Sequence, residues 1–151
     1  MEPFRSIYEL KVIREKREGY FPNHKYRNSA DVYLAFKDRF DKLDREEFLV
    51  LCLDAKNNLI GFNQVSVGSL TMSLVHPREV WKAAILANAA SIILLHNHPT
   101  GDPLPSAEDL QITKRIREIG ELFGIRVLDH IIVGDNRYVS FVDDCYWDKT
   151  V

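Results

Sequence analysis

The stretch ASIILLHNHPTGDPLPSAED, residues 90–109, joins an apolar run to an expected helix through a loop rich in proline and glycine. A short apolar run bounded by turn residues is typical of a strand that is buried on both faces. Alternate side chains of a strand point to the same face, so His96 and His98 are expected to project together. With the carboxylate of Asp109 they would form a three-ligand set typical of catalytic zinc sites.

The same residues also fit an ordinary connection from a strand to a helix. Ser106 and Asp109 have the S-x-x-D spacing of a helix cap, in which the serine accepts a backbone N–H and the acid lies near the positive end of the helix. Taken alone, His96 and His98 also fit two polar residues at the end of a strand. The spacing therefore leaves both a metal site and a structural connection open.

Helices and strands are expected to follow one another along the rest of the chain. Hydrophobic spacing predicts a helix from an N-cap at Ser29 to about Leu43. Strands over 46–54 and 59–67 flank turn residues and predict a hairpin. The other expected elements are a strand over 6–15, a short strand over 69–75, a helix opened by Pro77, and a hairpin of strands 125–134 and 137–142.

The helix after the loop is expected to begin at Ser106 and to end at Gly124. Its predicted buried stripe consists of Leu110, Ile112, Ile116, Ile119 and Phe123. Strands that are flanked and separated by helices predict an α/β sandwich with a mixed sheet.

Length and composition limit the possible classes of protein. A chain of 151 residues, 46% of them hydrophobic, is expected to form one domain over 29–151, preceded by an N-terminal strand and loop extension over 1–28. No apolar run reaches the roughly 18 residues of a membrane span, so no membrane partner is expected. The N-terminus lacks the features of a secretory signal, which predicts a cytoplasmic location.

Charge and cysteine content add two expectations. The formal net charge of -2 gives no general attraction to nucleic acid, and the locally basic segment near the start is interrupted by glutamates. Cys52 and Cys145 form no CxxC pair, which argues against a thiolate metal site, and Cys52 is expected to be a buried strand thiol.

The order His96-x-His98, seven residues, then Ser106-x-x-Asp109 matches the JAMM, or MPN-type, metalloprotease motif. The surrounding segments REEFLVLCLD, VHPREVWKAAILANAASIILLHNHPTGDPLPSAEDLQITKRI and IRVLDHIIVGDNRYVSF resemble the C-terminal domain of the RadC family, from about Asp44 to Val142. Full-length RadC proteins usually carry an N-terminal helix-hairpin-helix region whose hairpins contain glycine. Residues 1–44 contain a single glycine, Gly19, and no such hairpin. The sequence is thus similar to a short form of the family.

This resemblance implies a three-layer α/β/α sandwich with a mixed sheet, the cytidine-deaminase-like JAMM fold. It also implies about one zinc ion per chain, held by His96, His98 and Asp109. Ser106 would bind the developing oxyanion. A glutamate on another strand would act as general base, and Glu46 occupies the matching position.

The choice of Glu46 has limited support from the residues themselves. If strands 46–54 and 90–96 run antiparallel, the start of the first lies beside the end of the second, which brings Glu46 to the histidines. The strand is apolar on both faces, so its pattern does not decide between Glu46 and Glu47, and Glu47 stays the alternative. His130, beside Asp129, is expected to be a core histidine with satisfied hydrogen bonds rather than a metal ligand.

The function expected from the resemblance is zinc-dependent hydrolysis of amide bonds in a protein or peptide substrate, as a peptidase or isopeptidase. Two alternatives stay open: a non-catalytic interaction module stabilised by zinc, and a DNA repair or DNA-processing factor that binds nucleic acid. An exposed edge strand would also allow a homodimer.

Overall fold

The computed structural model describes residues 9, 11, 14–15, 25–68 and 75–151. Six of the ten residues of the strand predicted over 6–15, and six of the seven of the strand predicted over 69–75, lie outside these residues. Within the described part, the elements in chain order are α1 (Ser29–Phe40), β1 (Glu47–Leu53), β2 (Leu59–Val67), α2 (Pro77–Leu86), β3 (Ser91–Asn97), α3 (Ala107–Phe123), β4 (Arg126–Val133), β5 (Tyr138–Ser140) and a 3-10 helix, η1 (Trp147–Thr150). No helix among the described residues is long and apolar enough to cross a membrane.

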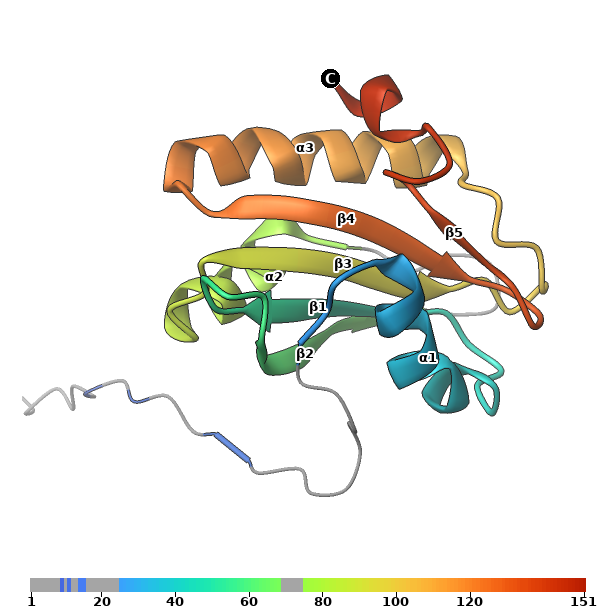
Figure 1. Cartoon of the computed structure of the whole chain (residues 1–151), viewed down its shortest axis with the longest axis horizontal. Helices are drawn as coiled ribbons and strands as arrows, with labels where there is room; N and C mark the ends of the chain where they lie inside the picture. The colour runs from blue at the N-terminus through green and yellow to red at the C-terminus, as the bar shows by residue number, and fades with distance from the viewer. Residues whose placement is uncertain (1–8, 10, 12–13, 16–24, 69–74) are drawn as a thin grey trace, which may run out of the picture.

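The five strands form one mixed sheet in the order β2-β1-β3-β4-β5 (Figure 1). β3 and β4 are parallel, and the other neighbouring pairs are antiparallel. Both predicted hairpins are present, with boundaries within a few residues of those expected. The central strands β1 and β3 are buried along their whole length, as their apolar composition predicts.

Helices cover both faces of the sheet. Side chains of one face, including Leu49 and Leu95, pack with Val32 and Phe36 of α1. Side chains of the other face pack with Trp81 of α2 and with α3 in a cluster made up of Phe48, Val50, Cys52, Val80, Trp81, Ala84, Ala89, Ile92, Leu94 and Ile116. This arrangement confirms the three-layer α/β/α sandwich and the buried thiol of Cys52.

The pairing of β1 with β3 determines which residues meet at one edge of the sheet. The two strands are antiparallel, and Phe48 lies opposite His96. Glu46, which precedes β1, accepts a backbone hydrogen bond from Gly68 and therefore stays in line with the strand. The amino end of β1 and the carboxyl end of β3 thus lie together, as expected.

The structure corrects two expectations about α1. The N-cap is Asn28, whose side chain accepts a hydrogen bond from the N–H of Asp31, and the helix ends at Phe40. Ser29 is the first helical residue, and its hydroxyl donates instead to Asp143. Asparagine and serine are both good caps, so local sequence did not distinguish the two positions.

α3 follows its predicted limits, with Ser106 as N-cap and Gly124 in the left-handed conformation at its C-terminus. Of the expected stripe, Ile116 is buried, and Ile112 and Ile119 are partly buried against the same core. The other buried residues of the helix are Asp109, Thr113 and Gly120. Phe123 is half exposed, although its ring makes a T-shaped contact with Trp81 at a centroid distance of 5.5 Å. Two polar residues therefore lie on the buried side of this helix.

The loop after β3 is held against the turn between β4 and β5. The N–H of His98 donates to the carbonyl of Val133 at 2.9 Å, and the N–H of Asp135 donates to the carbonyl of Gly101 at 2.8 Å. A Cβ atom at Gly134 would lie 2.7 Å from Cδ of Pro103 and closer still to the carbonyl oxygen of Gly101. The loop can approach this closely because Gly134 has no side chain.

We expect Gly134→Ala to lower the free energy of unfolding by about 1–3 kcal/mol, the range found for overpacked sites. Urea denaturation measures this effect. Gly61→Ala is the matched control, because a Cβ atom at Gly61 meets nothing within 4 Å. Equal stability of the two variants would contradict the close approach of loop and turn.

Candidate metal centre

Three side chains converge at the carboxyl end of β3. His96 is the second-last residue of β3, and His98 is the first residue after that strand. Asp109 comes from the first turn of α3. Nε2 of His96 lies 3.0 Å from Nε2 of His98 and 3.2 Å from Oδ1 of Asp109, and Nε2 of His98 lies 3.2 Å from Oδ2 of Asp109. The three residues each offer one ligand atom within 4.8 Å of the others, so the structure brings the predicted ligand set together.

The hydrogen bonds of His98 indicate which of its nitrogens faces the cluster unprotonated. Nδ1 lies 2.8 Å from the backbone carbonyl of Asp102, which can only accept a hydrogen bond, so Nδ1 carries the hydrogen. A neutral His98 then has its lone pair on Nε2, the atom that faces Asp109 and His96. Two nitrogen donors and a carboxylate so arranged fit a divalent metal ion.

Asp109 is also part of the helix cap that its spacing with Ser106 predicts. Its Oδ2 accepts hydrogen bonds from the N–H and the hydroxyl of Ser106, both at 2.8 Å, and its own N–H donates to the Ser106 hydroxyl at 3.1 Å. The same carboxylate faces both histidines. The capping arrangement and the metal cluster are therefore compatible, because the cap holds the carboxylate next to the Nε2 atoms of both histidines.

Glu46 and Glu47 lie on opposite faces of the sheet edge. Glu46 is half-buried and interacts electrostatically with all three residues of the cluster. Glu47 is 3% exposed and lies on the α1 side, where Arg39 pairs with its carboxylate and Gln64 donates to it at 2.7 Å. Glu47 therefore belongs to a structural ion pair, and Glu46 is the glutamate near the histidines.

Comparison with protein families gives a direct match. The RadC-like JAB domain matches residues 26–146, which is most of the chain. The chain belongs to this family. The match confirms the resemblance to RadC that the motif and its surroundings indicated.

Relatives of this RadC-like domain carry the name UPF0758 protein, which states no reaction. The sequence is 47% identical over 138 residues to one from Syntrophotalea carbinolica, covering 91% of this chain and 60% of the relative. It is 52% identical over 119 residues to one from Geotalea uraniireducens (79% and 52% covered) and 63% identical over 99 residues to one from Pelobacter propionicus (66% and 43% covered). The chain thus spans about half the length of the curated relatives it matches.

Burial and neighbouring charge shift the pKa values of the RadC-like site. Burial alone would raise the pKa of Asp109, but the hydrogen bonds that His96 and His98 donate when a proton occupies their Nε2 atoms hold it well below its usual range. Burial alone would lower the pKa of His98, but its bonds to Asp109 and to the Asp102 carbonyl raise it overall. A proton on His98 would therefore compete with a metal ion for the same position beside an ionised Asp109.

The pKa of Glu46 is raised, first by burial and then by the negative charge of Asp109, while His96 and His98 oppose the rise. A carboxylate with a raised pKa is a stronger base than an ordinary surface glutamate. The site thus holds two carboxylates whose pKa values are shifted in opposite directions, and such shifts are typical of functional sites.

Sequence reasoning missed Thr113 behind the cluster, and it predicted His130 without its contact to His96. His130 is fully buried and is a core histidine with both ring nitrogens hydrogen-bonded, as predicted. Its Nε2 lies 2.8 Å from Nδ1 of His96, and its Nδ1 lies 2.6 Å from the hydroxyl of Thr113 on α3. The available signal for Thr113 was its place four residues after Asp109, on the same face of the helix.

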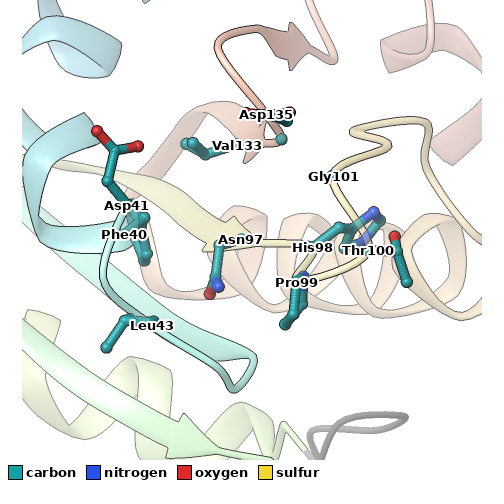
Figure 2. A pocket seen from close by; sticks show the side chains of 11 residues that line it. Phe40, Asp41, Leu43, Asn97, His98, Pro99, Thr100, Gly101, Val133 and Asp135 are labelled. Atoms are coloured by element: carbon teal, nitrogen blue, oxygen red, sulfur yellow. The ribbon is translucent and has the colours of Figure 1, made fainter.

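A hollow of about 230 Å³ lies beside the site, and Figure 2 shows the side chains around it. It contacts the cluster through His98, whereas Glu46 and Asp109 do not line it. Its lining comes from the end of α1, the end of β3 with its following loop, and the β4–β5 turn: Phe40, Asp41, Leu43, Asn97, His98, Pro99, Thr100, Gly101, Val133, Gly134 and Asp135.

Proposed function

We propose that this RadC-like domain is a zinc-dependent hydrolase of amide bonds, of the peptidase or isopeptidase type. The observation that carries the proposal is the convergence of two imidazole nitrogens and a carboxylate at the end of β3, with the half-buried Glu46 beside them. Membership of the JAB-domain family agrees with a metallohydrolase. The substrate is proposed to be a protein or peptide.

His96, His98 and Asp109 would hold the metal ion. Two imidazoles with one carboxylate suit zinc better than magnesium or calcium, which prefer shells of oxygen ligands. Zinc bound by three protein ligands lowers the pKa of water and polarises a carbonyl.

Glu46 would accept a proton from the attacking water and deliver it to the leaving amine. Its position beside the histidines and its raised pKa both suit this task. Glu47 is an unsuitable base because its carboxylate is buried and paired with Arg39.

Ser106 would donate a hydrogen bond to the substrate carbonyl oxygen as negative charge develops on it. Its hydroxyl donates to Asp109 at 2.8 Å, so it would have to rotate toward the substrate. The hydroxyl lies at the N-terminus of α3, where the helix dipole also favours negative charge.

We expect the purified wild-type protein to contain about one zinc ion per chain, because the donor set has three protein ligands and an open position. His98→Ala should release the metal, and elemental analysis measures it. His76→Ala is the control, since His76 is exposed and precedes α2. Full zinc content after replacement of both His96 and His98 would exclude this site.

Glu46→Gln should keep the fold and the zinc, whereas kcat on the best substrate from a peptide and isopeptide library should fall by about 100- to 10,000-fold. Glutamine has the same shape but does not accept the proton. Glu47→Gln is the matched control and should lower stability, because it weakens a buried ion pair, without a comparable loss of turnover. Unchanged kcat in Glu46→Gln would remove Glu46 from the mechanism, and loss of zinc would make it a ligand.

Ser106→Ala should lower both stability and turnover. Loss of the helix cap costs about 1 kcal/mol of unfolding free energy, and loss of an oxyanion donor lowers kcat by roughly 100-fold or more. Asn28→Ala is the control, because it removes the cap of α1, which packs on the other face of the sheet, and should change stability alone. If Ser106→Ala behaves in the same way as Asn28→Ala, Ser106 is only a cap.

A further inference from the structure

The inner side of His96 faces the protein interior rather than the metal cluster. His96 is fully buried, and its Nδ1 lies 2.8 Å from Nε2 of His130 on the neighbouring strand β4. The direction of this hydrogen bond decides the chemistry of the other nitrogen of His96. A neutral imidazole carries one hydrogen, so a hydrogen on Nδ1 leaves a lone pair on Nε2, and the reverse blocks metal binding.

The Thr113 hydroxyl indicates the direction. Its Oγ1 lies 2.6 Å from the backbone carbonyl oxygen of Asp109 and 2.6 Å from Nδ1 of His130. The carbonyl oxygen can only accept, so the single hydroxyl hydrogen goes there. Thr113 must then accept from His130, which places the hydrogen of His130 on Nδ1.

The same reasoning extends to His96. His130 is fully buried, and its ring bonds only to a hydroxyl and another imidazole. In the neutral form, with its hydrogen on Nδ1, its Nε2 has the lone pair and accepts from Nδ1 of His96. A neutral His96 then has its own lone pair on Nε2, which faces His98 and Asp109.

We propose that Thr113 and His130 are positioning residues that fix the tautomer of His96, so that its Nε2 lone pair faces the metal. This inference rests on the proposed metal site. The chain of hydrogen bonds runs from His96 through His130 and Thr113 to the backbone of Asp109, and it therefore links two of the three ligands. It also ties β3, β4 and α3 together behind the site.

The surroundings of the two rings hold them in place. Phe48 stacks on His96 with ring centroids 5.3 Å apart, and Phe141 stacks on His130 at 4.6 Å. Both phenylalanines are buried. Hydroxyls of helical threonines often bond to the carbonyl four residues earlier without further purpose. The second contact of Thr113, to His130, is the feature that extends this ordinary bond to a metal ligand.

Thr113→Val tests the proposal in the full chain, because valine keeps the shape and removes the hydroxyl. Zinc affinity, measured by competition with a chelator, should fall by about 10- to 100-fold, the range for loss of a partner behind a metal ligand. Thr113→Ser restores the hydroxyl and should restore most of the affinity. Thr150→Val is the matched control, since Thr150 is a buried threonine whose hydroxyl bonds to Trp147 and Arg117.

A spectroscopic measurement tests the direction of the bonds without the metal. Long-range ¹H–¹⁵N correlation spectra of the metal-free wild type, at a pH where the imidazoles are neutral, should show the hydrogen on Nδ1 in both His96 and His130. Thr113→Val should lose this single tautomer, and Thr150→Val should keep it. If Thr113→Val does not fold, the wild-type spectrum alone decides.

Two results would overturn the proposal: a hydrogen on Nε2 of His130 in the wild type, or unchanged zinc affinity and tautomer in Thr113→Val. Failure of Thr113→Ser to restore affinity would also contradict it, because the hydroxyl would not be the cause. A wild type that binds no zinc would instead refute the proposed function, and the metal-free spectrum would still decide the direction of the bonds.

Discussion

Unprotonated nitrogens and a carboxylate repel one another at hydrogen-bonding distance unless a proton or a metal ion lies among them. Nε2 of His96, Nε2 of His98 and the carboxylate of Asp109 meet at distances of 3.0–3.2 Å. Much of the fold serves to hold them there. β3 lies between β1 and β4 and carries His96, with His98 directly after it. The loop after β3 is hydrogen-bonded to the β4–β5 turn, and the first turn of α3 places Asp109 beside the histidines.

Asp109 shows how one residue can serve the fold and the site together. Its carboxylate completes the cap of α3 with Ser106 and faces both histidines. The positive end of the helix and the neighbouring imidazoles favour its ionised form, which is the form that binds a cation. The spacing of Ser106 and Asp109 fits either a helix cap or a metal ligand, and the structure shows that Asp109 can serve as both.

Much of this arrangement could be predicted from the sequence, because apolar strands, turn residues and a spaced set of polar side chains leave strong local signals. The resemblance favoured Glu46, but the strand pattern did not separate it from Glu47, since β1 is apolar on both faces. The contacts of Glu47 with Arg39 and Gln64 place it on the α1 side. The contact of His130 with His96 was equally hidden, because it depends on the parallel register of β3 and β4. The contact of His130 with Thr113 depends in turn on the packing of α3 against β4. The prediction of Ser29 as the N-cap of α1 was wrong for a different reason, because Asn28 and Ser29 are adjacent and cap helices about equally well.

We propose that the three side chains at the end of β3 hold one metal ion. Anomalous X-ray diffraction from crystals of the zinc-loaded wild type, recorded on both sides of the zinc absorption edge, tests this assignment. We expect one strong anomalous peak per chain, bounded by Nε2 of His96, Nε2 of His98 and the carboxylate of Asp109. A peak elsewhere, coordination through Nδ1 of either histidine, or no peak in zinc-loaded crystals would contradict it.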